Sequence, residues 1–121
     1  MKILIVDDKP SLSSLLSQFL GQSYEVTVRE DGLGALTWLQ EGNIPDLIIT
    51  DLEMPGMDGF ELIEKVKTSG FFSEVPIIVL SCQDSSAIRI KCLKLGADDY
   101  IIKPFNPEEL VIRIEKILVT Q

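Results

Sequence analysis

The chain begins with the segment KILIVDD at residues 2–8, in which four apolar residues follow one another without a polar interruption. Two similar runs follow, LII at residues 47–49 and IIVL at residues 77–80. All three are too short for helices, and a short apolar run without alternation is typical of a strand covered on both faces. The sequence therefore predicts a parallel sheet with helices on both sides.

Five strand-like segments occur in all, at residues 2–6, 24–28, 47–50, 76–80 and 100–102. Helical patterns separate them, and glycines lie where these helices should end, at positions 21, 42, 70 and 96. The helix expected at residues 32–41 has the least favourable composition, because Gly32 and Gly34 each cost it about 1 kcal/mol, although Asp31 can cap it. Strand and helix alternate five times, which predicts a doubly wound α/β fold with strand order 2-1-3-4-5.

Composition narrows the classes of function. A length of 121 residues fits one domain, and no apolar run is long enough for a membrane span or a signal peptide, so a cytoplasmic protein is expected. The formal net charge of -8 argues against direct binding to nucleic acid or to anionic lipid. Cys82 and Cys92 are expected to be reduced thiols, and since the chain has no histidine, a phosphohistidine donor would have to come from a partner.

Acidic residues follow two strands that should be neighbours in this sheet. Asp7 and Asp8 follow the first strand, and Asp51 follows the third. Neighbouring strands lie about 4.8 Å apart, so the three carboxylates should converge and repel one another unless they take up protons or hold a cation. Oxygen ligands and a small ligand set favour Mg2+ over Ca2+.

The fourth and fifth strands end in residues that can donate hydrogen bonds. Ser81 follows the fourth strand and Lys103 follows the fifth. A cation, an ammonium group and a hydroxyl together can neutralise a transferring phosphoryl group, and Asp51 between them is placed to attack phosphorus and form an acyl phosphate. Taken alone, each residue has an ordinary interpretation as a turn, capping or solvated side chain, and Asp58 is expected to cap a helix. Their joint placement at the strand ends carries the hypothesis.

From residue 1 to about residue 118, the chain resembles the receiver domain of two-component response regulators, which has a flavodoxin-like fold with five helices. The resemblance rests on IVDD at residues 5–8, DLEMPGMDG at residues 51–59, Ser81, and GADDYIIKPF at residues 96–105. It implies that Asp8, Asp51 and the backbone carbonyl of Glu53 bind Mg2+, with Asp7 acting mainly through water. It also implies that Lys103 pairs with phosphorylated Asp51, that Ser81 and Tyr100 report the modification, and that the Lys103-Pro104 bond is cis.

The resemblance further implies a phosphorelay partner, a histidine kinase or a phosphotransfer protein, and a switch that is not a metabolic enzyme but catalyses its own phosphorylation and slow dephosphorylation. Glu53 and Gln83 occupy positions that tune dephosphorylation in this family, and Cys82 replaces a smaller residue.

Four charged residues resemble those with which receivers attached to winged-helix DNA-binding domains form dimers: Arg89, Asp99, Glu109 and Arg113. The expected pairs across the dimer are Arg89 with Glu109 and Asp99 with Arg113. The alternative is an intrahelical ion pair, because Glu109 and Arg113 are four residues apart in the favourable order. In the dimer reading the output is transcription, and an output domain follows residue 121.

Three other functions are also compatible with parts of the sequence. A dehalogenase-like phosphatase also uses an aspartyl phosphate, but that resemblance expects Asp-x-Asp after the first strand. A flavin or dinucleotide binder needs a glycine-rich or hydroxyl-rich phosphate cradle, where this chain has Asp7 and Asp8. The third alternative is a binding module whose acidic site is vestigial.

Overall fold

The computed structural model describes residues 1–119 and contains five strands alternating with five helices. The strands are β1 (Lys2–Val6), β2 (Glu25–Arg29), β3 (Leu47–Thr50), β4 (Ile77–Ser81) and β5 (Asp99–Ile102). The helices are α1 (Pro10–Leu20), α2 (Gly32–Gln40), α3 (Gly59–Thr68), α4 (Ser86–Leu95) and α5 (Pro107–Val119). All strand pairs are parallel and the order is β2-β1-β3-β4-β5, which confirms the predicted topology.

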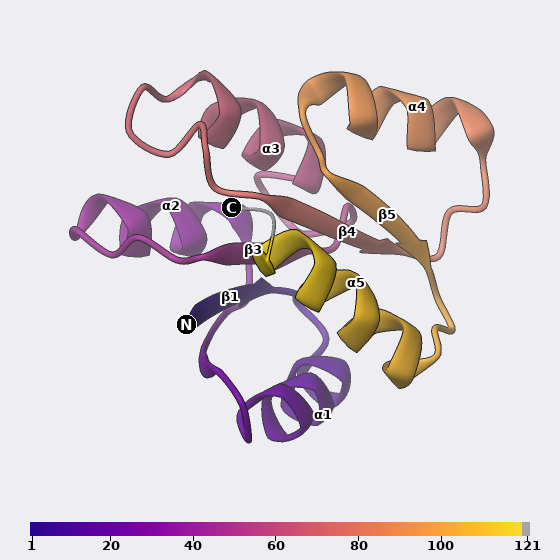
Figure 1. Ribbon diagram of the computed structural model, residues 1–121. Coiled ribbons are helices and arrows are strands. Elements are labelled where there is room, and N and C mark those ends of the chain that lie inside the picture. Colours follow the sequence, from indigo (N-terminus) through magenta and orange to yellow (C-terminus); the bar gives the residue numbers. More distant parts are fainter. Residues whose placement is uncertain (120–121) are drawn as a thin grey trace.

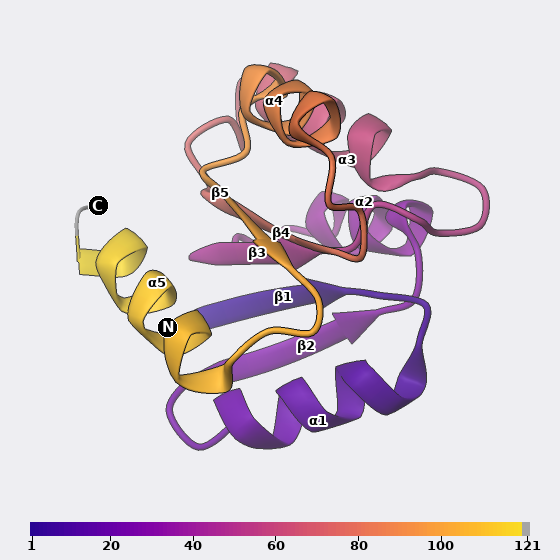
Figure 2. The ribbon, with the colours of Figure 1, turned by 90° about the vertical axis from the view of Figure 1, so that its right-hand side faces the viewer.

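The sheet lies between two helical layers. Helices α2, α3 and α4 cover one face, whereas α1 and α5 cover the other (Figures 1 and 2). Strand β1 explains why both layers are needed. Its residues Ile3 and Ile5 join the core cluster under α1 and α5, and Leu4 and Val6 join the cluster under the other three helices. Because successive side chains of a strand point to opposite faces, an uninterrupted apolar run fills two cores at once.

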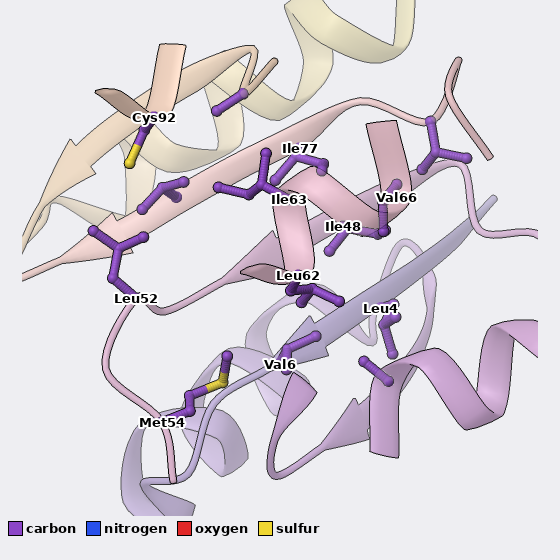
Figure 3. Close-up of a cluster of buried hydrophobic side chains, with 14 of the residues drawn as sticks. Leu4, Val6, Ile48, Leu52, Met54, Leu62, Ile63, Val66, Ile77 and Cys92 are labelled. Carbon is purple, nitrogen blue, oxygen red and sulfur yellow. The ribbon is translucent and has the colours of Figure 1, made fainter. Parts of the chain in front are cut away.

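The larger cluster is drawn in Figure 3. It includes Leu62, Ile63 and Val66 of α3 together with the strand residues Ile48 and Ile77. All five are at most 1% exposed, and burial of a side chain of this size contributes about 1.5–3 kcal/mol. This layer therefore fixes α3 firmly against the centre of the sheet.

Most predicted boundaries agree with the structure to within a residue. Strands β2 and β4 are each displaced by one residue from the predicted ranges, and β5 begins one residue earlier, at Asp99, but ends at residue 102 as predicted. The helix of least favourable composition, α2, forms as predicted, and the Asp31 carboxylate accepts a hydrogen bond from the Gly34 amide at 2.7 Å. Asp58 caps α3 in the same way, accepting from the Glu61 amide at 2.9 Å.

Gly59 has a specific steric reason to be glycine. A methyl group at this position would lie 2.3 Å from the backbone oxygen of Asp51 and 2.7 Å from the Cα atom of Leu52. The first turn of α3 therefore packs directly against the backbone at the end of β3. Within residues 1–119, no helix has both the length and the apolar composition needed to cross a membrane.

Candidate functional site

The predicted site residues lie at the carboxyl edge of the sheet, where backbone hydrogen bonds continue one residue past the strands. The Asp51 amide donates to the Val6 carbonyl at 3.0 Å, and the Asp7 amide donates to the Arg29 carbonyl at 3.0 Å. On the other side of β3, the Lys103 amide donates to the Ser81 carbonyl at 2.8 Å. The positions of these residues are thus set by the sheet itself rather than by free loops.

Three carboxylates converge as predicted. One oxygen each of Asp7, Asp8 and Asp51 lies within 4.8 Å of the others. Asp7 and Asp51 are only 4% exposed, whereas the Asp8 side chain is 34% exposed. Like charges this close repel strongly where water is excluded, so the cluster favours a cation among them.

The two oxygens of Asp51 have different surroundings. Oδ1 accepts hydrogen bonds from the Leu52 amide at 2.7 Å and from the Glu53 amide at 3.4 Å. Oδ2 lies 3.3 Å from the Lys103 ammonium and 3.3 Å from the Lys9 ammonium. One oxygen is therefore held by the backbone, and the other faces two lysine ammonium groups.

Lys103 links two of the three acids. Its Nζ atom lies 3.4 Å from Asp7 Oδ2 as well as 3.3 Å from Asp51 Oδ2, and its side chain is only 11% exposed. The Lys103-Pro104 peptide bond is cis, as the resemblance implied. The second oxygen of Asp7 accepts a hydrogen bond from the Lys9 amide at 2.8 Å. Both oxygens of Asp7 thus have protein partners, in keeping with an indirect role at a metal.

Lys9 is a site residue that the sequence analysis missed. Its side chain is 54% exposed, yet Nζ reaches Asp51 Oδ2 and lies 4.0 Å from Asp8 Oδ1. The attraction of Asp51, and to a smaller extent of Asp8 and Asp7, raises the pKa of Lys9 above its ordinary value despite the opposing effect of burial. A signal was present in the sequence, because Lys9 directly follows the two acids.

Ser81 and Tyr100 belong to one network around Gln83. The Ser81 hydroxyl accepts a hydrogen bond from the Gln83 amide at 3.0 Å, and the Tyr100 hydroxyl donates to the Gln83 carbonyl at 2.7 Å. The Gln83 side chain donates to the Glu53 carboxylate across the opening of the site. Tyr100 is 8% exposed, and burial raises the pKa of its hydroxyl, while the Ser81 hydroxyl opposes this shift. Tyr100 thus lies inward, directly behind Ser81.

The network borders a cleft of about 590 Å³ beside the acids. Its lining includes Asp8, Lys9, Glu53, Phe60 and Gln83. Solvent and small molecules can therefore approach the acidic cluster from the side of α3 and α4. Cys82, next to Ser81, is exposed.

Three of the four residues of the predicted dimer face, Asp99, Glu109 and Arg113, are joined by hydrogen bonds within one chain. Arg113 donates to both oxygens of Asp99 at 2.8 Å and pairs with Glu109 at 3.0 Å, all within one chain. The intrahelical alternative for Glu109 and Arg113 is thus present in the structure. These hydrogen bonds, with Asp99 first, raise the pKa of Arg113. Arg89 is exposed on α4.

Comparison with known proteins agrees with this geometry. The family model of the response regulator receiver domain matches residues 3–115. The chain therefore belongs to the response regulator receiver family, whose members are phosphoacceptor switches of two-component systems.

Individual relatives define this relationship further. The DNA-binding response regulator MtrA of Mycolicibacterium smegmatis is 40% identical over 114 residues, which are 93% of this chain and 48% of that protein. A putative response regulator from Chloroflexus aurantiacus superposes with a TM-score of 0.91 at 37% identity, over 98% of this chain and 97% of that one. The chain spans less than half the length of these curated relatives: 45–49% of the regulators and 12% of the sensor histidine kinase TmoS of Ectopseudomonas mendocina.

A third relative bears on the acidic cluster. The response regulator Rcp1, whose Mn2+-bound form has been solved, superposes with a TM-score of 0.81 at 29% identity, over 96% of this chain and 90% of that one. In the present chain, the close approach of three carboxylate oxygens suits a hard divalent ion with oxygen ligands. The residues therefore fit the Mg2+ that the resemblance implies.

Proposed function

We propose that Asp51 is the phosphoacceptor and that this chain stores a phosphoryl group supplied by a phosphohistidine partner. The observation that carries the proposal is the unequal environment of the two Asp51 oxygens. The backbone amide of Leu52 holds Oδ1 at 2.7 Å, which leaves Oδ2 facing Lys103 at 3.3 Å. A fixed carboxylate with one oxygen directed at positive charge is a positioned nucleophile.

In the proposed transfer, the Asp51 oxygen forms a bond to phosphorus as the bond between phosphorus and the donor imidazole nitrogen breaks, and the electron pair leaves with that nitrogen. Lys103 then pairs with the phosphoryl oxygens, and Ser81 donates its hydroxyl to one of them. Asp8, Asp51 and the Glu53 carbonyl would hold Mg2+, which supplies further positive charge against the phosphoryl oxygens. Asp7 orients Lys103 through their 3.4 Å contact.

The chain has no histidine, so a partner has to supply the phosphoryl group. An apolar groove of about 290 Å³ lies beside the site and is lined by Leu12, Leu15, Phe19, Phe105 and Lys103. Leu15 and Phe19 are 60% and 42% exposed. Because Lys103 borders the groove, an apolar helix seated there would bring its own histidine near Asp51. A histidine kinase or phosphotransfer protein with such a helix suits this surface.

In this proposal, phosphorylation changes the surface of the chain and releases no metabolite. Ser81, Gln83 and Tyr100 connect the site to α4 and β5, so a change at Ser81 reaches the face formed by α4, β5 and α5. We expect this face to control an output such as transcription, because two relatives of about twice this length are the DNA-binding response regulator MtrA and the transcriptional regulatory protein BaeR. This chain itself, with a formal net charge of -8, is not expected to bind nucleic acid.

Phosphorylation is tested by incubating the chain with acetyl phosphate and Mg2+ and measuring the intact mass. One phosphoryl adduct is expected, and it should disappear in Asp51→Asn and on removal of the metal. Asp58→Asn is the matched control, because Asp58 is an exposed acid of the same loop and should leave the adduct in place. An unmodified wild-type chain with several small donors would favour the vestigial module instead. Steady release of phosphate from varied phosphomonoesters would favour the phosphatase.

Dimerisation through the face of α4, β5 and α5 is a second proposal, favoured by exposed apolar residues next to the charges. Ile90, Leu93 and Ile112 are 48%, 46% and 54% exposed. The pair of Asp99 with Arg113 within one chain would have to be exchanged for the same pair across the dimer. Light scattering with and without beryllofluoride measures this, and a monomer under both conditions would contradict the proposal.

A further inference from the structure

Lys9 contacts the same carboxylates that are proposed to hold the metal. Its ammonium group lies 3.3 Å from Asp51 Oδ2 and 4.0 Å from Asp8 Oδ1. An ion pair between two exposed side chains is ordinarily worth between zero and about 1 kcal/mol. Here one partner, Asp51, is only 4% exposed. Because little water can solvate this carboxylate, its attraction to the Lys9 ammonium is screened less than in an exposed pair.

The two lysines at Asp51 Oδ2 differ in their freedom to leave. Lys103 is 11% exposed and has a second partner in Asp7. The Lys9 side chain is 54% exposed, and what fixes Lys9 is its backbone amide, which donates to Asp7 Oδ1 at 2.8 Å. The Lys9 ammonium can therefore swing out to water without disturbing the backbone around the acids, whereas the Lys103 ammonium cannot.

The charge balance of the acidic cluster indicates when the Lys9 ammonium would leave it. Three carboxylates face the two ammonium groups, which leaves a local net charge of -1. A divalent ion among the acids would make this +1 with both lysines in place, and neutral if one lysine left. Two cations cannot share one carboxylate oxygen at short range without repulsion.

We propose that Lys9 is a tethered cation that competes with Mg2+ for Asp8 and Asp51 and leaves them when the metal binds. The inference rests on the proposed metal-dependent function and adds a residue that sets its metal requirement. Lys9 holds the acids together in the metal-free state and weakens the apparent affinity for Mg2+. The responsiveness of the switch to Mg2+ is thereby set by a residue outside the ligand set.

The test is a calorimetric titration of the chain with Mg2+ at constant ionic strength, comparing wild type, Lys9→Gln, Lys9→Arg and Lys94→Gln. Loss of the competing charge in Lys9→Gln should lower the Kd for Mg2+ about three- to tenfold. Lys9→Arg keeps the charge and should stay close to wild type. Lys94→Gln removes an exposed lysine from the last turn of α4, at the opposite edge of the sheet, and controls for the change in net charge.

Thermal unfolding gives a second, independent measurement. Without metal, Lys9→Gln should have a lower Tm than wild type, because the acids lose a counterion, and saturating Mg2+ should raise its Tm by more. Lys9 makes no side-chain cap to α1, so the substitution leaves the helix start intact. A Kd for Lys9→Gln that equals or exceeds that of Lys94→Gln would overturn the role of Lys9 while leaving the metal site standing. Absence of Mg2+ binding in wild type and all variants would overturn the proposed metal-dependent function as well.

Discussion

Helices α3 and α4 cover the same face of the sheet, yet they are held there very differently (Figure 1). Each follows a strand whose end carries a site residue, Asp51 before α3 and Ser81 before α4. Three apolar side chains of α3 are fully buried, Leu62, Ile63 and Val66. Cys92 is the one buried residue of α4, and its Ile90 and Leu93 are about half exposed.

The attachments at the helix starts differ too. The Gly59 amide donates to the Leu52 carbonyl at 2.9 Å, which joins the first turn of α3 to the backbone next to Asp51. The loop before α4 instead depends on the Tyr100 hydroxyl, which holds the Gln83 carbonyl at 2.7 Å. One cation–π contact, with Lys91 Nζ 4.1 Å from the centre of the Phe60 ring, links α4 to α3. The difference indicates that α3 fixes the phosphoacceptor, whereas α4 can shift at low cost when Ser81 and Tyr100 change their partners.

The largest effect should come from removing the same side chain from each helix. Ile63 of α3 is 0% exposed, and Ile88 of α4 packs against the same core cluster but is only partly buried. Ile63→Ala should lower the free energy of unfolding by about 3 kcal/mol, because it leaves a cavity in a closed core. Ile88→Ala should lower the free energy of unfolding by about 1 kcal/mol, because the side-chain atoms that it removes are only partly buried. Urea denaturation measures both.

Because the two substitutions remove the same atoms, the chemistry of the change is matched and only the site differs. Losses of equal size would show that α4 is as firmly packed as α3, and the comparison between the two helices would fail. Circular dichroism before denaturation checks that both variants keep their helices.

Much of this architecture could be predicted from the sequence, for a physical reason. Uninterrupted runs such as residues 3–6 can be buried only on both faces of a sheet, and alternation with helices then restricts the strand order. Parallel strands end at the same edge, so Asp7, Asp51, Ser81 and Lys103 could be placed together without knowledge of any loop. The glycine cost in α2 did not prevent the helix, because Asp31 caps it and Trp38 and Leu39 are buried.

Contacts made across loops were not predictable in this way. The reach of Lys9 to Asp51 and the bridge from Gln83 to Glu53 depend on the path of the backbone between strand and helix, about which hydrophobic periodicity is silent. The contact of Arg113 with Asp99 within one chain was not predicted either, and the prediction of the same pair across a dimer is not tested by it. The requirement for glycine at position 59 was not predicted, because it depends on the backbone atoms of Asp51 and Leu52 that a Cβ atom would approach.

A smaller effect should follow from Tyr100→Phe, which should loosen the attachment of α4 and leave that of α3 unchanged. The substitution removes the hydroxyl that donates to the Gln83 carbonyl and keeps the ring. A neutral hydrogen bond of this kind contributes about 1 kcal/mol, so amide exchange in Ser86–Leu95 should become roughly fivefold faster. Exchange in Gly59–Thr68 should not change. Hydrogen exchange followed by mass spectrometry measures both helices in one experiment.

Tyr24→Phe is the matched control, since Tyr24 packs with the cluster on the opposite face of the sheet. Beryllofluoride, which mimics the phosphorylated state, extends the test. In wild type it should change the exchange of α4 more than that of α3, and in Tyr100→Phe the response of α4 should shrink while the analogue still binds. If α4 responds fully without the hydroxyl, then the signal does not pass through the contact between Tyr100 and Gln83, and the weak packing of α4 would have to transmit it by another route.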